Sequence, residues 1–309
     1  MQFKHLVFYL SFTLFLLIGF YFFLVQQTTI KQTDRPRIIC TTTIIADTIK
    51  NIAQDSIDLK ILMGPGVDPH AYKPIEQDII TIVQADLIFY NGLHLEARMA
   101  DIFERLGNKT VAITSDMPKN QLIYSKEFNQ YPDPHVWFDP MLWIYAVHTI
   151  ATHLQKMIPQ NFEQYENNKH EFIQKIHQTY QTTKEMMLKI QPEQRILITA
   201  HDAFSYFARA YDCKVISLQG ISTASEAGTR DIQNLIHFIV QHKIPTIFAE
   251  SCIPTRSMQA LIQGTQAQGW SVKLGQELFS DALGSPNSLP GTYLGMLKWN
   301  THGIERSLQ

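Results

Sequence analysis

Runs of strand-like composition alternate with longer segments of helical spacing through most of the chain. In the first half, short β-branched and aromatic runs predict strands over residues 37–41, 57–63, 87–90 and 110–113. Between and after them, the spacing of apolar positions predicts helices over residues 45–53, 76–84, 96–106 and 141–157. This alternation predicts an α/β fold whose mostly parallel sheet is covered by helices on both faces.

A long uninterrupted helix is predicted in the middle of the chain. Residues 160–190 contain neither Gly nor Pro, and at ~1.5 Å per residue such a helix would span ~46 Å. Its apolar positions do not keep a strict heptad, which favours a rigid connecting helix over a coiled-coil arm. After Pro192 the alternation resumes, with strands predicted over 195–199, 214–218, 246–249 and 271–274 and helices over 203–211, 229–241, 257–268 and 291–309.

These patterns divide the 309 residues into four parts. We predict an N-terminal signal or signal-anchor segment with its tether over residues 1–36. An N-terminal α/β lobe follows over 37–158, a linking helix over 159–191 and a C-terminal α/β lobe over 192–309. Both lobes have an ordinary domain size.

The N-terminus carries a long apolar run. Leu6–Val25 is nearly all apolar and follows Lys4, and ~20 helical residues match a ~30 Å hydrocarbon core. A cleaved secretory signal and an uncleaved anchor both fit, but the length of the run and the lack of a small-residue cleavage site favour the anchor. Lys4 keeps the N-terminus inside, so the folded part is expected to be extracytoplasmic. No Cys directly follows the run, so a lipid on an N-terminal Cys is not expected.

Composition and charge exclude other classes of protein. Charged residues make up 17% of the chain and the formal net charge is -2, which is typical of a folded globular protein without the basic stripe of a nucleic-acid binder. The three cysteines Cys40, Cys213 and Cys252 form no CxxC pair, so a thiolate zinc site is not expected.

One tripeptide occurs twice in the predicted first lobe. Asp68-Pro69-His70 and Asp133-Pro134-His135 each follow a turn-rich or polar loop. The proline stiffens the backbone, so each His is presented from a rigid turn. The neighbouring Asp is suited to accept a hydrogen bond from the outer ring nitrogen or from a backbone amide, which would orient the His as a metal ligand.

Two further candidates lie in the predicted second lobe. His201 follows a predicted strand, and Asp281 ends the segment 277–281. Ligands of open α/β sheets bind beyond the carboxyl ends of the strands, so His70, His135, His201 and Asp281 are expected to meet across a cleft between the lobes. Imidazoles suit zinc, copper and iron, and a carboxylate extends the range toward manganese. Four protein ligands leave zinc closed to water, which favours carrying the ion over catalysis.

Six segments, in order, resemble one family of transport proteins. They are 64–74, 91–96, 133–140, 200–211, 278–284 and 291–296. Together they resemble the cluster A-I metal-binding receptors of bacterial ABC transporters, from about residue 37 to the C-terminus. The segment 219–226 is similar to the treponemal type of receptor, which binds zinc and manganese.

The resemblance implies a fold, a function and a set of ligands. It implies two (β/α)4 lobes with parallel sheets joined by one long rigid helix, and a metal site in the cleft between the lobes. It implies a monomeric, non-enzymatic receptor that binds zinc, manganese or iron through His70, His135, His201 and Asp281. The ion would be delivered to a membrane permease that works with a cytoplasmic ATPase. Members with Glu in place of His201 tend to be manganese receptors.

Two departures from the family pattern bear on metal and anchoring. Many zinc receptors have a His/Asp-rich loop before the second ligand, whereas residues 115–132 contain no His, which weakens an assignment to zinc alone. The usual lipoprotein cysteine is missing, which supports the peptide anchor.

Two alternative functions remain open at this point. A metal-dependent hydrolase of the cell envelope would need an open coordination position and a general base, for which Glu250 is the candidate. A structural role for Glu250 is the simpler interpretation. An adhesin on the same fold is the other alternative.

Overall fold

The first sheet has four parallel strands in the order β2-β1-β3-β4. They are β1 (Arg37–Cys40), β2 (Asp58–Ile61), β3 (Leu87–Tyr90) and β4 (Thr110–Ala112). Ile38 of the central strand β1 pairs with Leu59 on one side and Leu87 on the other. The central strands are buried, as expected for a parallel sheet with helices on both faces. This computed structural model describes residues 35–125 and 131–309 of the chain.

Helices α2 (Thr43–Ala53), α3 (Glu76–Val83), α4 (Ala100–Leu106) and α5 (Pro140–Met157) complete the first lobe. Local chemistry explains where α5 begins. The Asp139 carboxylate accepts hydrogen bonds from the amides of Met141 and Leu142, and Pro140 occupies the first helical position. Both features are favoured at helix N-termini. They place the start of α5 five residues after His135, so the helix supports that turn.

The second lobe contains two pairs of parallel strands. β5 (Ile196–His201) pairs with β6 (Lys214–Gln219), and β7 (Thr246–Ile247) pairs with β8 (Lys273–Leu274). A hydrogen bond from the Phe248 amide to the Ile198 carbonyl joins the two pairs at 2.8 Å. The helices of this lobe are α7 (Ser205–Tyr211), α8 (Thr229–Gln241), α9 (Arg256–Ala267) and α10 (Tyr293–Leu308). The structure thus has the four strands predicted for this lobe, although β7 and β8 are shorter than expected.

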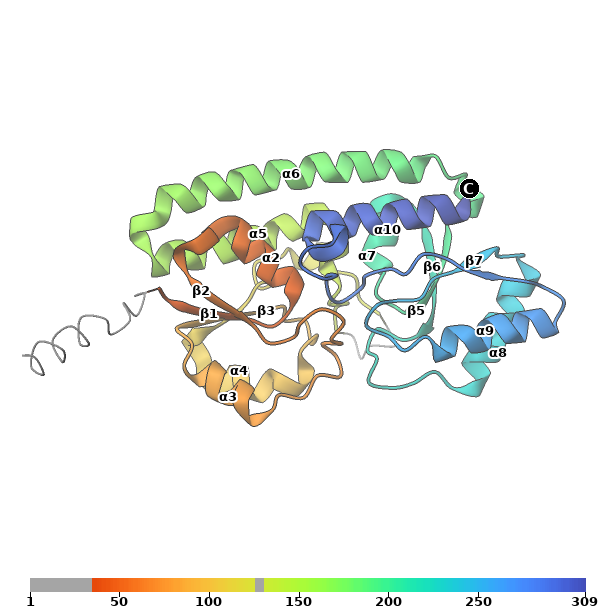
Figure 1. Cartoon of the computed structure of the whole chain (residues 1–309), viewed down its shortest axis with the longest axis horizontal. Helices are drawn as coiled ribbons and strands as arrows, with labels where there is room; N and C mark the ends of the chain where they lie inside the picture. The colour runs from red at the N-terminus through yellow and green to blue at the C-terminus, as the bar shows by residue number, and fades with distance from the viewer. Residues whose placement is uncertain (1–34, 126–130) are drawn as a thin grey trace, which may run out of the picture. The chain divides into compact units, whose positions relative to one another are not determined.

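The predicted linking helix is α6 (Phe162–Leu188), preceded by a 3-10 turn over Pro159–Asn161. In Figure 1 this helix runs along the α/β units, beside α5 and α2 at one end and near α7 and α10 at the other. Its buried side chains join a hydrophobic core to which both lobes contribute. They include Tyr165, Phe172, Ile176 and Met187. The helix is therefore packed against both lobes and is not a free connection between them. Residues 36–309 form one compact unit. The lobe boundaries at 158 and 191 stay predictions.

Hydrogen bonds tie the two lobes together around residues 133–137. The Tyr206 hydroxyl of α7 donates to the Asp133 carbonyl at 3.0 Å and accepts from the Ile123 amide. Trp137 donates its indole N–H to the Ser280 carbonyl, and the Tyr293 hydroxyl donates to the Trp137 carbonyl. All of these groups except the Ile123 amide belong to buried residues, and buried hydrogen bonds of this kind are costly to break.

No helix within residues 35–125 and 131–309 is both long and apolar enough to cross a membrane. The anchor predicted over Leu6–Val25 lies outside the described residues.

Candidate metal centre

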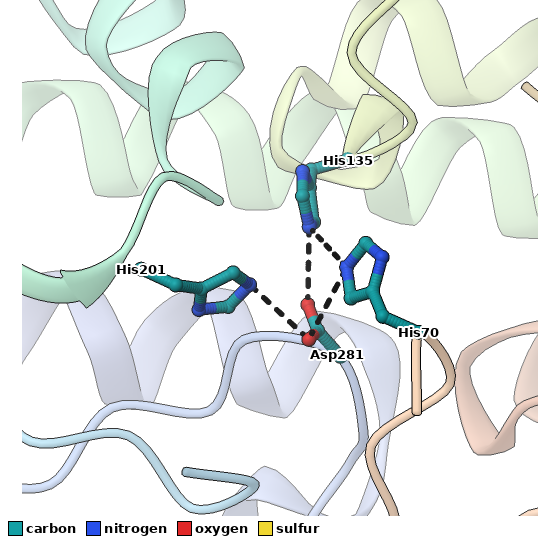
Figure 2. Close-up of side chains that lie close together, drawn as sticks. All are labelled: His70, His135, His201 and Asp281. Atoms are coloured by element: carbon teal, nitrogen blue, oxygen red, sulfur yellow. Dashed lines mark hydrogen bonds and ion pairs between the residues drawn. The ribbon is translucent and has the colours of Figure 1, made fainter. Parts of the chain in front are cut away.

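The first Asp-Pro-His turn lies between β2 and α3. The Asp68 Oδ1 atom accepts a hydrogen bond from the His70 amide at 2.9 Å and a weaker one from the Ala71 amide at 3.4 Å. The expectation that this Asp accepts from a backbone amide is confirmed. These bonds fold the turn so that the buried His70 ring points into the interior, as Figure 2 shows.

The second Asp-Pro-His turn is bonded more tightly. The Asp133 Oδ1 atom accepts from the His135 amide at 2.9 Å and lies 2.7 Å from the His135 Nδ1 atom. Here the Asp contacts both the backbone and the ring, which leaves the Nε2 atom facing the other candidates. Asn91 donates its side-chain amide to the Pro134 carbonyl at 3.0 Å and so holds the turn against the end of β3.

His201 is the last residue of β5 rather than a loop residue. The Glu250 Oε1 atom accepts hydrogen bonds from the amides of Ala200 and His201 at 2.8 and 2.9 Å. The Glu250 Oε2 atom lies 2.6 Å from the His201 Nδ1 atom. A carboxylate on the outer ring nitrogen fixes the tautomer and orientation of a metal-binding His. Sequence reasoning missed this role of Glu250; its position just after β7, the neighbour of β5, was the available signal.

Asp281 completes the group from the loop that precedes α10. It is fully buried, and Figure 2 shows its carboxylate among the three rings. Its Oδ1 atom lies 3.4 Å from His135 Nε2, and its Oδ2 atom lies 3.2 Å from His201 Nε2 and 3.8 Å from His70 Nε2. One ligand atom from each of the four residues lies within 4.8 Å of all the others. The structure thus brings all four sequence-predicted candidates together.

Burial and charge shift the pKa of these side chains in opposite directions. Burial lowers the pKa of His70 to about 3, only partly opposed by the Asp281 carboxylate. Burial also acts to lower the pKa of His201, but the carboxylates of Glu250 and Asp281 outweigh it and hold that pKa well above the usual value. Burial acts to raise the pKa of Asp281, and the three imidazoles outweigh it and lower the pKa. Asp281 is therefore ionised at neutral pH, whereas His70 is neutral.

The spacing of these atoms suits a transition-metal ion. Ligand atoms at ~2.0–2.1 Å in a tetrahedron lie ~3.3 Å apart, and the His70 and His135 Nε2 atoms are 3.2 Å apart. Both Asp281 oxygens are buried and accept no hydrogen bond from the described residues. A buried carboxylate is costly unless a cation neutralises it, and either a protonated His201 or a bound metal ion would supply that charge. The donor set therefore fits one divalent ion.

Other histidines of the chain lie outside this group. The His94 ring lies against the Tyr131 ring at a tilt, with the ring centroids 3.7 Å apart. His302 is exposed on α10. In the described residues, only the group around Asp281 gathers three or more His, Cys, Asp or Glu side chains at metal-binding spacing.

Comparison with known proteins identifies the family of this chain. Residues 38–307 match the family model described as "ZnuA: Zinc-uptake complex component A periplasmic". The chain belongs to this family. Membership confirms the resemblance to metal-binding receptors drawn from the segments around the four candidates.

Two relatives in the zinc-uptake component A family have names that refer to different metals. The chain is 43% identical over 273 residues to the zinc-binding protein TroA of Treponema pallidum, covering 88% of this chain and 87% of the relative. It is 38% identical over 282 residues to the manganese-binding lipoprotein MntA of Bacillus subtilis, covering 90% and 92%. The solved structure of the periplasmic zinc-binding protein TroA from Treponema pallidum superposes with a TM-score of 0.87 at 42% identity, covering 89% of this chain and 99% of that one. The predicted two-lobe α/β fold is thereby confirmed.

Proposed function

We propose that this chain is an extracytoplasmic receptor that binds one zinc or manganese ion and delivers it to an ABC transporter. His70, His135, His201 and Asp281 are the proposed ligands. The observation that carries the proposal is the buried set of three imidazoles and one carboxylate, with one ligand atom from each residue within 4.8 Å of the others. Family membership supports it, because the relatives are named for binding zinc or manganese.

The two oxygens of Asp281 would allow the site to bind either of these metals. One oxygen with the three imidazoles supplies the tetrahedral set that zinc takes. Since Oδ1 faces His135 while Oδ2 faces His70 and His201, both oxygens together would supply five donors. A carboxylate that binds through both oxygens suits manganese, which favours oxygen ligands and higher coordination. We infer that the site accepts either ion.

The contacts of Glu250 argue against the hydrolase alternative. A hydrolytic metal site keeps one coordination position open for water and needs a base beside it. Both Glu250 oxygens are directed at the backbone or ring of His201, and Glu250 itself is 1% exposed. This carboxylate thus holds a ligand in place rather than facing a water. No contact of the described residues favours the adhesin alternative, and we do not develop it.

As such a receptor, the chain would be tethered to the membrane by its N-terminal segment. Its partner would be the transporter permease with its ATPase. The apolar run over Leu6–Val25 supports the tether. We expect the full chain to sediment with membranes after cell lysis, and a chain in which a cleavable secretory signal replaces residues 1–34 to appear in the extracytoplasmic soluble fraction. Equal release of both forms from the membrane would contradict a lasting tether.

Metal-dependent melting of the purified full chain tests the receptor function. After stripping with a chelator, the protein receives Mn²⁺, Zn²⁺ or Fe²⁺ under anaerobic conditions. An ion that binds only the folded state stabilises it by about 2.7 kcal/mol at a hundred times its Kd, which gives a clear increase in melting temperature. We expect one equivalent of bound metal and loss of the increase in His201→Ala.

The matched control is His302→Ala, which removes an exposed histidine far from the proposed ligands in sequence and leaves them intact. It should melt and respond to metal like the parent chain. If none of the three ions binds or raises the melting temperature of the parent chain, the receptor function is wrong.

A further inference from the structure

The loop of residues 220–228 between β6 and α8 has no part in the site described so far. It contains most of the segment that is similar to the treponemal type of receptor. The Thr223 hydroxyl donates a hydrogen bond to the Asp68 Oδ2 atom at 2.6 Å, across 155 positions of sequence. The bond joins this second-lobe loop to the first Asp-Pro-His turn. Both residues are only half-buried.

The two oxygens of Asp68 have separate partners. Oδ1 accepts from the amides of His70 and Ala71 within its own turn. Oδ2 accepts from Thr223 of the other lobe. Asp68 therefore connects Thr223 to the backbone of His70. A movement of the 220–228 loop would be transmitted to His70 through this one carboxylate.

His70 depends on its backbone contacts more than the other two imidazoles. Asp133 lies against the His135 Nδ1 atom and Glu250 against the His201 Nδ1 atom, each from the same lobe as its His. Among the described residues, no carboxylate lies within ion-pair distance of the His70 Nδ1 atom; its only such contact is from Nε2 to Asp281. The position of His70 consequently rests on how Asp68 holds the turn.

The 220–228 loop is weakly supported by its own lobe. A cavity of about 810 Å³ lies between this loop, β6 and α8, and Ala224, Ser225 and Glu226 are exposed. Among described residues, the bond from Thr223 is the loop's only hydrogen bond to the first lobe. Around residues 133–137, by contrast, Tyr206, Trp137 and Tyr293 join the lobes through several buried bonds. The two lobes are thus joined by fewer hydrogen bonds on the side of the site near the loop.

We propose that Thr223 is a positioning residue that retains the bound metal ion by fixing the His70 turn through Asp68. This inference rests on the proposed receptor function. When the bond breaks, the turn and the loop separate and His70 withdraws from the ion. The bond thereby sets how fast the ion leaves while the remaining ligands stay in place.

Rates of metal release test this role. The full chain loaded with Zn²⁺, or separately with Mn²⁺, is mixed with excess EDTA while tryptophan fluorescence is followed; the Trp137 ring lies 5.3 Å from the His135 ring. Thr223→Val keeps the shape of the side chain and removes the hydroxyl. A hydrogen bond to a charged acceptor corresponds to a rate change of about tenfold or more. We expect release from Thr223→Val to be faster by that factor.

Further variants separate positioning from a general structural role. Thr223→Ser keeps the hydroxyl and should release metal at the parent rate, and Ser225→Ala is a control in an exposed part of the same loop. Thr223→Ala should repeat the result of Thr223→Val. In a chain that carries Asp68→Ala, Thr223→Val should add no further acceleration. The metal-free Thr223→Val chain should still unfold in one cooperative transition, so that faster release cannot be assigned to an unfolded protein.

Several results would overturn the proposal. Release from Thr223→Val at the parent rate would do so, as would a Thr223→Ser variant as fast as Thr223→Val. Equal acceleration by Ser225→Ala would also do so. These results leave the receptor function standing, because the parent chain would still bind Zn²⁺ or Mn²⁺. A parent chain that binds neither ion would instead remove the receptor function and this inference together.

Discussion

Replacing Asp281 by asparagine is expected to weaken metal binding strongly while the fold survives. Asp281 is fully buried, and it is the single carboxylate in the proposed shell. Asparagine has the same shape, but it lacks the negative charge that offsets the charge of the ion. Removing one partner of a buried charge pair costs about 3–5 kcal/mol, so affinity should fall at least about a hundredfold. Isothermal titration of the stripped chain with Zn²⁺ and Mn²⁺ measures the loss.

The matched control is Asp101→Asn, which makes the same change at an exposed position on α4. This variant should bind metal like the parent. Circular dichroism and a cooperative melt of metal-free Asp281→Asn show whether the variant is folded. A folded Asp281→Asn chain that keeps the parent affinity for both ions would contradict the assignment of Asp281 as a ligand.

Metal affinity is expected to rise about tenfold per pH unit between pH 6 and pH 8. The carboxylates of Glu250 and Asp281 overcome burial and raise the pKa of His201 well above its usual value, so metal-free His201 still carries a proton at a pH where an ordinary imidazole is neutral. Its Nε2 atom must lose that proton to bind the ion, which releases about one proton per ion bound. His70 adds nothing to this slope, because burial lowers its pKa to about 3 and it is already neutral.

Proton release is measured by titrating metal in buffers of equal pH and different ionisation enthalpy. The slope of the observed heat against buffer enthalpy gives the number of protons. His302→Gln removes an exposed histidine and should not change that number. An affinity that is constant from pH 6 to pH 8, with no effect of the buffer, would show that His201 is neutral before metal binds.

Much of the fold could be predicted because its signals are local. The bounds predicted for β3 at 87–90 and for α8 at 229–241 are those of the structure. The helix predicted over 96–106 was wrong at its start: a 3-10 turn over Ala97–Met99 precedes α4. The Glu96 carboxylate turns inward to accept from the Thr41 hydroxyl and the amides of Asn91 and Gly92. Those contacts are tertiary, and helical spacing does not contain them.

The candidate ligands could also be predicted by local reasoning, since a rigid Asp-Pro-His turn and a polar residue at the end of a strand are local features. Their partners could not. Glu250 reaches His201 across 49 positions because β7 lies beside β5. Thr223 reaches Asp68 across 155 positions because the two lobes face each other. Sequence alone determined which side chains offer metal-binding atoms, because turn chemistry and strand ends depend on neighbouring residues. The packing of both lobes against α6 decided whether those atoms lie within 4.8 Å, because distances between remote residues depend on the whole core.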